Sequence, residues 1–386
     1  MPLDRHRTPF LILSSIVVGW LGWSGYVLLL PVAICFSAIW SLARTRMQAA
    51  ICSAAYFLAA ARGLPQGVAT YYTADFLPGV FLWFAASSGF VFVHMMLWTN
   101  RQGLRKPLYY LVAAFLTAIP PFGIMGWAHP LTSAGVLFPG WGWFGLGATA
   151  TGLAVMTTRF RPVAAIAILG FWLWSAAQWT APNVPASVRS VDLQFGSSLG
   201  RVSSLDRQQE LVAAAHRQIR APVVVLPESA IGFWTPTIER FWQRQLVDRT
   251  SSVIAGASAV NNDGYDNVLV RIDGTTSEIL YRQRMPVPGS MWQPWRPLIG
   301  EAGGAGAHFF ANPVVAVGEL KIAPLICYEQ LLVWPVLQSM MHEPDLIVAV
   351  GNGWWTAGTS IIEIQKASAG AWARLFDKPI VFSFNT

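Results

Sequence analysis

A cysteine and a glutamate end two apolar runs, where they could act as nucleophile and base. Cys327 follows Ile322-Ala-Pro-Leu-Ile326, and Glu228 follows Val223-Val-Val-Leu-Pro227. Both runs predict buried strands, and catalytic groups of open α/β sheets collect at the carboxyl ends of strands. A thiol that attacks a carbonyl needs a base, and burial raises the pKa of a carboxyl group toward the range where it can serve. The two residues are therefore a candidate Glu–Cys pair.

Each of these residues also has a simpler interpretation. Cys35 and Cys52 lie in apolar stretches of the first half, so Cys327 has no disulfide partner in the second half. It is either buried and inert or retained for its chemistry. Glu228 taken alone is typical of a helix-capping or salt-bridged acid. Three histidines of the second half could pair with the thiol, although none stands in a recognisable motif: His216, His308 and His342.

Short β-rich runs alternate with amphipathic stretches after about Ser190, which predicts an α/β layered domain over residues 186–386. The predicted strands are Ser190–Phe195, Val223–Leu226, Val253–Ala259, Val268–Ile272, Glu278–Arg282, Val314–Val317, Lys321–Ile326, Leu346–Val350 and Ile380–Phe384. The predicted helices are Asp206–Ile219, Thr237–Thr250, Leu331–Met341 and Ile361–Phe376. Turn residues at Asn262–Asp266 and at Asp273-Gly274 predict two hairpins.

The first half carries too little charge for a domain that folds in water. The whole chain is 54% hydrophobic and 12% charged, whereas about 25% charge is typical of soluble domains. Up to Pro185 the acids are Asp4 and Asp75, so the positive charge of the chain originates here. A membrane domain of about seven helices over residues 1–185 is expected. The predicted spans are Phe10–Trp23, Val27–Leu42, Ala49–Ala61, Phe76–Trp98, Leu108–Trp127, Gly135–Met156 and Val163–Trp179.

The basic residues predict the orientation of these spans. They concentrate in every second gap, at Arg5 and Arg7, Arg44 and Arg46, Arg101 to Lys106, and Arg159 and Arg161. The positive-inside rule then places the N-terminus in the cytoplasm. An odd number of spans predicts a multi-pass protein of a bacterial inner membrane with a periplasmic C-terminal domain. Because the bases are spaced between apolar runs, direct nucleic-acid binding is not expected.

Four segments resemble, in order and spacing, the motif blocks of the nitrilase (carbon-nitrogen hydrolase) superfamily. They are Leu226-Pro-Glu-Ser229, Tyr281-Arg-Gln-Arg-Met-Pro-Val-Pro288, Ile326-Cys-Tyr-Glu329 and Asn352-Gly-Trp-Trp355. The architecture is similar to that of the apolipoprotein N-acyltransferases, in which a periplasmic nitrilase-like domain follows membrane spans. The stretch Arg282–Pro294 also resembles plasmid conjugal-transfer proteins related to that family. The resemblance implies an αββα-type fold and substrate contacts from Tyr328, Glu329, Trp292 and Trp354.

Two departures from the acyltransferase pattern bear on activity. The resemblance implies a Glu-Lys-Cys triad of Glu228, position 283 and Cys327, but position 283 holds glutamine, and the second glutamate of the family aligns with Ser290 or Met291. An amide donates a hydrogen bond without charge, so Gln283 would stabilise an oxyanion less than an ammonium does. Arg282 or Arg284 is the candidate substitute cation. The chain also stops at Asn385-Thr386, so a C-terminally truncated form of the fold is expected.

Three functions are compatible with these residues. The first is an acyltransferase that forms a Cys327 thioester and passes the acyl group to an amine. The second is an amide or nitrile hydrolase, and the third is a non-catalytic component of a conjugation or envelope machine. The expected partners are membrane lipids, a lipoprotein or other amine acceptor, and conjugation-apparatus proteins. No metal-ligand spacing, phosphate loop or cofactor motif is recognisable, so no cofactor is expected.

Overall fold

The computed structural model describes residues 3–73, 75–101, 103–198, 204–218 and 221–386. By their contacts these residues form two compact units. The helical unit comprises Met1–Pro182, Leu331–Trp334 and Gly358–Asp377, and the sheet unit comprises Asn183–Gln330, Pro335–Ala357 and Lys378–Thr386. The sequence-based division has one boundary, after residue 185, whereas the contacts assign two later segments to the helical unit. Independent folding of 1–185 and 186–386 stays a prediction.

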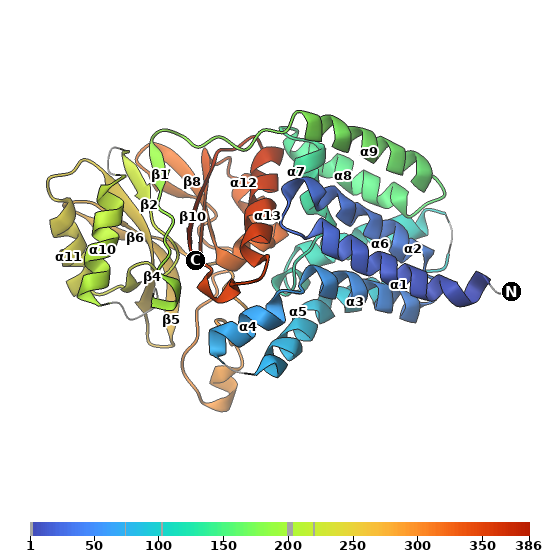
Figure 1. The fold of residues 1–386 in the computed structure, drawn as a ribbon, viewed down its shortest axis with the longest axis horizontal. Helices are drawn as coiled ribbons and strands as arrows, with labels where there is room; N and C mark the ends of the chain where they lie inside the picture. Colours follow the sequence, from blue (N-terminus) through green and yellow to red (C-terminus); the bar gives the residue numbers. More distant parts are fainter. Residues whose placement is uncertain (1–2, 74, 102, 199–203, 219–220) are drawn as a thin grey trace. The chain divides into compact units, whose positions relative to one another are not determined.

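The sheet unit contains two sheets (Figure 1). In the first, the order is β1-β2-β4-β5-β6, and the short β3 also pairs with β4. Its strands are β1 Val188–Ser190, β2 Val223–Val225, β3 Gly232–Phe233, β4 Ser252–Val260, β5 Tyr265–Ile272 and β6 Ser277–Arg282. The second sheet has the order β10-β9-β8-β7, formed by β7 Val315–Val317, β8 Leu320–Ile326, β9 Leu346–Asn352 and β10 Ile380–Asn385. In both sheets parallel strands are followed by an antiparallel edge.

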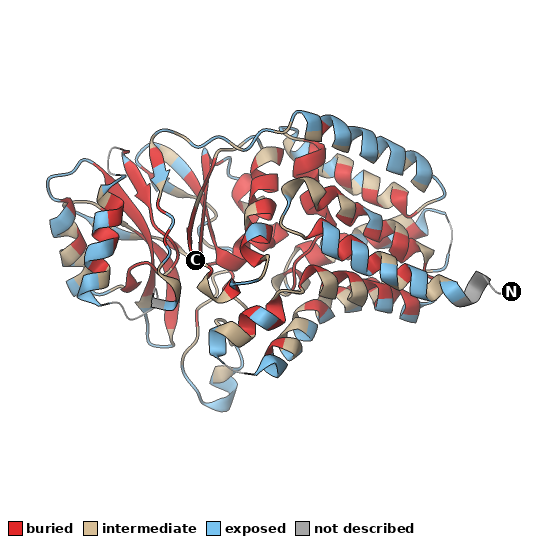
Figure 2. Cartoon of the chain, in the orientation of Figure 1, coloured by how far each residue is buried: buried red, intermediate tan, exposed pale blue. Residues whose placement is uncertain are grey.

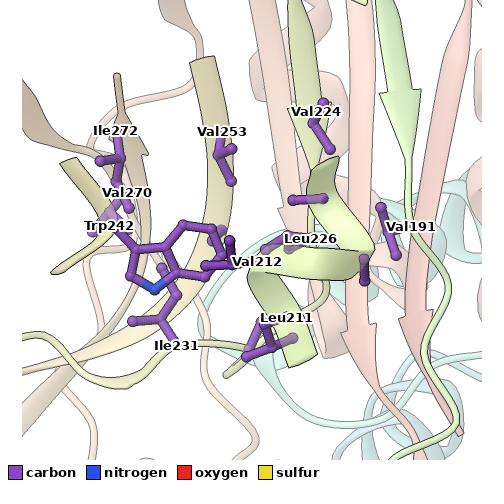
Figure 3. Packing of buried hydrophobic residues seen from close by; sticks show 14 of the residues in the cluster. Val191, Leu211, Val212, Val224, Leu226, Ile231, Trp242, Val253, Val270 and Ile272 are labelled. Carbon is purple, nitrogen blue, oxygen red and sulfur yellow. The ribbon is translucent and has the colours of Figure 1, made fainter. Parts of the chain in front are cut away.

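The first sheet is buried on both faces. One face packs against the second sheet in an apolar cluster that includes Val225, Leu269, Ile326 and Val350. The other face is covered by helices α10 (Leu205–His216) and α11 (Pro236–Leu246). Figure 3 shows the indole of Trp242, from α11, among the aliphatic side chains of this second cluster. Burial on both faces explains why the central strands read as continuous apolar runs instead of alternating ones.

Most predicted elements of this unit are confirmed within a few residues, including both antiparallel hairpins. The predicted strand Ser190–Phe195 is wrong. After β1 the chain crosses from the first sheet to the second, so that the Val191 N–H donates to Val225 O and the Leu193 N–H to Phe384 O. The predicted helix Leu331–Met341 is confirmed as α12 (Val333–Met340), which begins two residues later because the 3-10 turn η6 (Cys327–Leu331) precedes it. The predicted helix end at Ile219 lies outside the described residues.

Among its described residues, the helical unit contains eight longer helical elements in its N-terminal part and one from the C-terminal part. They are α1 Leu3–Gly22, the 3-10 helix η1 Val27–Ile34 with α2 Cys35–Leu42, α3 Arg46–Ala60, α4 Leu64–Tyr72, α5 Phe76–Met96, α6 Arg105–Ala118, α8 Gly142–Met156, α9 Arg161–Ala177 and α13 Ile361–Leu375. Aromatic side chains fill the interior, where Tyr56 stacks on Phe36 and donates a hydrogen bond to Ala128 O. The C-terminal helix α13 is buried almost throughout and packs on the short α7 (Ala134–Leu137).

The predicted spans differ from these helices in length. Leu108–Trp127 was expected as one helix, but α6 ends at Ala118 because Pro120 and Pro121 lack the amide hydrogens that a continuing helix needs. Gly135–Met156 is divided into α7 and α8, and α4 was not predicted. By length and composition one helix among the described residues, α5, is able to cross a membrane, while the Val27–Leu42 segment, α8 and α9 are apolar but shorter. A domain of about seven spans is therefore not shown.

Candidate active site

Glu228 lies directly after β2, in a turn held against β4. A Cβ atom on Gly256 would lie 2.5 Å from Glu228 Cα, so only glycine allows this close approach. The side chain of Glu228 is 4% exposed. Its Oε1 accepts a hydrogen bond from Asn267 Nδ2 at 2.7 Å, and its Oε2 accepts one from the Asn352 N–H at 3.0 Å. The carboxyl group is thus fixed by β5 on one side and by the end of β9 on the other.

Cys327 lies where β8 turns into η6, and its thiol hydrogen-bonds the Glu228 carboxyl group. Its φ of 50° is in the left-handed region, which L-residues avoid at a cost of about 1–2 kcal/mol. A sharp turn between a strand and a helix is the backbone form that presents a nucleophile beyond the end of a sheet. Ser229, next to Glu228, has a similar φ of 59°. A left-handed residue therefore lies at Cys327 itself and next to Glu228.

Burial gives Glu228 the properties of a base near neutral pH. Removal from water raises the pKa of its carboxyl group from 4.5 to about 7. The hydrogen bonds from Asn267, Asn352 and Cys327 oppose this rise, and the neighbouring Glu329 adds to it. A carboxyl group with a pKa near the working pH can accept the thiol proton and later return it.

Gln283 is fully buried just after β6 and shares the Asn267 amide with Glu228. Its Oε1 accepts a hydrogen bond from Asn267 Nδ2 at 2.8 Å, and its Nε2 donates to Ile326 O at 3.0 Å, one residue before the cysteine. The structure thus brings Glu228, Cys327 and Gln283 together, as the motif spacing predicts. The amide carries no charge to match a developing oxyanion.

Glu329 and Arg284 are both fully buried, and the Arg284 backbone N–H donates a hydrogen bond to the Glu329 carboxyl group. Glu329 accepts hydrogen bonds from the Tyr281 hydroxyl at 2.8 Å and from three backbone N–H groups, those of Arg284, Met285 and Ile326. Burial raises its pKa, and the Arg284 guanidinium and these donors oppose the rise. This carboxyl group joins the end of β6 to the end of β8. Its geometry is that of a structural support for Cys327, not of a substrate contact.

Neither arginine is available as the substitute cation. Arg284 is fully buried, and its five N–H donors are used by five oxygen acceptors, on Tyr281, Pro335, Gln338, Pro324 and Ser339. Arg282 is partly exposed and pairs with Asp266, whose other oxygen lies 2.8 Å from His308 Nε2. Because consecutive residues of a strand point to opposite faces, Arg282 is directed away from the face that carries Gln283.

A family model described as carbon-nitrogen hydrolase matches residues 58–374. The chain belongs to the carbon-nitrogen hydrolase family. It is 60% identical over 388 residues to the probable conjugal transfer protein TraB of Sinorhizobium fredii, with both chains covered in full. It is 55% identical over 395 residues to the conjugal transfer protein TraB of Agrobacterium fabrum, which covers 99% of this chain and 94% of that one.

Among solved structures the chain is similar to a mutant of the Nesterenkonia AN1 amidase from the nitrilase superfamily. The identity is 12% and the TM-score is 0.33, over 45% of this chain and 68% of that chain. A TM-score this low adds nothing to the family assignment, which rests on the family model and on the two relatives. The carbon-nitrogen hydrolase fold is therefore the fold of this chain, with glutamine at position 283.

The other predicted site residues of this carbon-nitrogen hydrolase differ in their burial and in their contacts. Tyr328 is buried beside Cys327, and Trp354 opens the turn that follows Asn352. Trp292 packs edge to face on Phe309, with ring centroids 5.5 Å apart. Two of the candidate histidines make other contacts: His216 Nε2 lies 3.2 Å from Gln245 O, and His308 pairs with Asp266.

Sequence reasoning missed Asn267 as a member of this site. It stands within β5, in a run of buried residues, and a lone amide among buried side chains is the signal that could have identified it.

A cavity of about 500 Å³ lies at the other ends of the strands, near Pro222, Ser252 and Leu320, and none of the site residues lines it. Within the described ranges, no group of three or more His, Cys, Asp or Glu residues is placed to hold a metal ion.

Proposed function

We propose that this carbon-nitrogen hydrolase family member forms an acyl thioester on Cys327 and passes the acyl group to an amine during plasmid conjugal transfer. Glu228 takes the thiol proton as sulfur attacks the carbonyl carbon, and a C–S bond forms while the carbonyl electrons move to oxygen. When the carbonyl re-forms, the leaving group departs with the proton from Glu228. The amine then attacks the thioester, loses its proton to Glu228, and releases the thiol.

The hydrogen bond between the Cys327 thiol and the Glu228 carboxyl group carries this proposal. A structural domain has no need to place a lone thiol against a buried acid whose pKa is near 7. Hydrolysis of amides would use the same thioester with water as the acceptor, and the fold alone does not distinguish the two reactions. Because Gln283 is neutral, it would stabilise an oxyanion less than an ammonium group does, so we expect a slower enzyme than one with lysine at this position.

A membrane setting supports the transfer reaction over hydrolysis, because acyl donors are then supplied by lipids. Side chains on the outer faces of the helical unit are unusually apolar for a surface in water. Phe144 is 86%, Ile166 72% and Trp174 68% exposed, and α9 is exposed along most of its length (Figure 2). Such a surface is typical of contact with lipid or protein. The names of the two relatives support conjugal transfer, and conjugation-apparatus proteins and an amine acceptor are the proposed partners.

The test is whether Cys327 acquires an acyl group. Full-length protein from donor-cell membranes is digested and analysed by mass spectrometry for a hydroxylamine-sensitive adduct on the Cys327 peptide. We expect the adduct in the parent protein and its absence in Cys327→Ser. Because Glu228 acts in both the formation and the breakdown of the thioester, Glu228→Gln should lower the rate of adduct formation, followed over time, by about a hundredfold or more. Glu210→Gln, an exposed acid on α10, is the matched control and should match the parent.

Plasmid transfer frequency is the second measurement. We expect Cys327→Ser and Glu228→Gln to lose transfer while the amount of protein in the membrane is unchanged. If both variants support normal transfer and no adduct forms, the domain is a non-catalytic scaffold.

A further inference from the structure

Asn267 connects two groups of the site from the middle of the first sheet. Its side chain is 1% exposed. The amide nitrogen donates to Glu228 Oε1 at 2.7 Å and to Gln283 Oε1 at 2.8 Å. The backbone of Asn267 is held on both sides, because it pairs with Ser258 of β4 and its carbonyl oxygen accepts the Gln283 N–H at 2.8 Å. One rigid amide therefore sets the positions of both neighbouring side chains.

The contact with Asn267 determines which way the Gln283 amide points. With its oxygen toward Asn267, Gln283 directs its nitrogen to Ile326 O, at the strand end that carries the cysteine. A lysine at position 283 would have only donors to offer and could not accept from Asn267. Asn267 and Gln283 are thus chemically matched to each other.

This arrangement leaves Asn267 Oδ1 buried without a hydrogen-bond partner among the described residues. An unsatisfied buried acceptor lowers the stability of a fold. A residue chosen only for stability would avoid this cost, since an aliphatic side chain at this buried position would leave no polar atom unsatisfied. The asparagine is explained by what its two N–H groups hold.

We propose that Asn267 is a positioning residue of the Cys327 site, which holds Glu228 in its ionised, proton-accepting orientation and fixes the amide of Gln283 beside the nucleophile. This inference rests on the proposed function of Cys327 and Glu228. Asn267 acts through these two residues. Substitution of Asn267 should therefore change the pH dependence of Cys327 thiol reactivity, and not only the rate at a single pH.

The experiment follows alkylation of Cys327 by iodoacetamide, in which a C–S bond replaces the C–I bond and iodide leaves. Full-length protein with Cys35→Ser and Cys52→Ser is used, so that one thiol reports. In the parent, labelling should rise through about pH 7, because the first proton of the Glu228–Cys327 pair is lost there. Asn267→Ala removes a donor that favours the ionised carboxylate, so the midpoint should move up by about one pH unit.

Two further variants separate positioning from a structural role. Asn267→Asp keeps the size of the side chain but places carboxylate oxygens against the oxygens of Glu228 and Gln283. The midpoint of this variant should therefore move up at least as far as that of Asn267→Ala. Asn262→Ala, on the exposed turn between β4 and β5, is the matched control and should keep the parent midpoint. If Asn267→Ala does not fold, Asn267→Ser, which retains one donor, is measured instead and should give a smaller upward shift.

The outcomes distinguish this inference from the proposed function. If Glu228→Gln labels at Cys327 with the same rate and pH midpoint as the parent, the proposed function fails. If Glu228→Gln changes the labelling, but folded Asn267 variants keep the parent midpoint and rate, the inference about Asn267 is overturned. A change in melting temperature without a change in midpoint also contradicts it, because that result describes a merely structural residue.

Discussion

Glu228 and Glu329 are both buried carboxyl groups, but their surroundings differ. Glu329 has an arginine beside it and accepts hydrogen bonds from a hydroxyl and three backbone N–H groups. Glu228 has no cation among its described partners and receives two N–H donors and a thiol. A buried carboxylate with a full set of donors is favoured in its ionised form and stabilises local structure. With fewer donors, a buried carboxyl group has a pKa closer to neutral pH and can exchange protons.

Stability should depend on pH through Glu228. Its folded pKa of about 7 lies above the ordinary 4.5, so the folded protein binds more protons than the unfolded chain between these values. The contribution of Glu228 to stability is therefore present below about pH 4.5 and lost as the pH rises toward 7, by about 3 kcal/mol for a shift of this size.

Melting temperatures of the parent and Glu228→Gln, measured from pH 4.5 to 8 in detergent, check this expectation. The parent should lose stability relative to the variant across the window, and Glu210→Gln should follow the parent. Parallel curves for the parent and Glu228→Gln would show that Glu228 titrates at its ordinary value.

The two arginines that flank Gln283 should behave differently on substitution. Arg284→Met removes the donors of five acceptors and the positive charge near the buried Glu329, so we expect a loss of about 3–5 kcal/mol and little folded protein. Arg282→Met removes one partner of the buried Asp266, which keeps its contact with His308, so we expect a smaller loss of about 1–2 kcal/mol. Thermal melts and Cys327 alkylation measure the two effects. Loss of alkylation in a folded Arg282→Met protein would identify Arg282 as the missing cation after all.

At the scale of elements, the site depends on strand ends that only close packing can hold. Glu228 approaches β4 because position 256 is glycine, and Cys327 occupies a left-handed conformation at the end of β8. Asn352, which donates its N–H to Glu228, ends β9, and the chain then continues through the turn η7 (Trp354–Thr356) into α13. Helix α13 belongs by contact to the helical unit. A residue of the site and a helix of the other unit are therefore joined by a few residues of chain.

The close packing of α13 on α7 within the helical unit can be tested by substitution at their crossing point. A Cβ atom on Gly135 would lie 1.7 Å from Ala371 O, so Gly135→Ala forces the two helices apart. We expect a loss of about 1–3 kcal/mol, measured as a lower melting temperature. Gly147→Ala, on α8, meets no atom within 4 Å and should be neutral or stabilising by about 1 kcal/mol. Equal effects of the two substitutions would contradict the close crossing.

At the scale of the whole molecule, apolar side chains cover the outside of the helical unit, whereas basic residues concentrate in alternate connections. These two patterns have separate causes in a membrane protein, since lipid contact selects the first and insertion of the chain selects the second. Among the described residues one helix is long enough to span a bilayer by itself, and three apolar helical segments are shorter.

Reporter fusions measure the topology of the chain. Because of the alternation of basic connections, a reporter active only in the periplasm should be active when fused at Thr386 and silent when fused after Arg105. A cytoplasmic reporter at the same two points should give the opposite result and serves as the control. Activity of the periplasmic reporter after Arg105, with silence at Thr386, would reverse the proposed orientation.

The sequence by itself determined the order of strands and helices in the second half and the residues of the Glu–Cys pair. Buried strands carry continuous apolar runs, and the polar residues that end them are visible as interruptions, so the pattern together with the family motifs singles out Glu228 and Cys327 as candidates. The replacement of lysine by Gln283 is likewise visible from the motif.

Only the tertiary structure decided what surrounds this pair. Asn267 and Asn352 reach Glu228 across 39 and 124 residues of chain, and no local pattern specifies such contacts. Arg284 looks like a spare cation in the sequence, yet five acceptors use all its donors, and four of these five lie in distant segments. Helix α13 was predicted correctly as a helix, but its placement with the N-terminal helices follows from side-chain packing. Local propensity determines elements, whereas hydrogen-bond partners and packing depend on which distant segments the fold brings together.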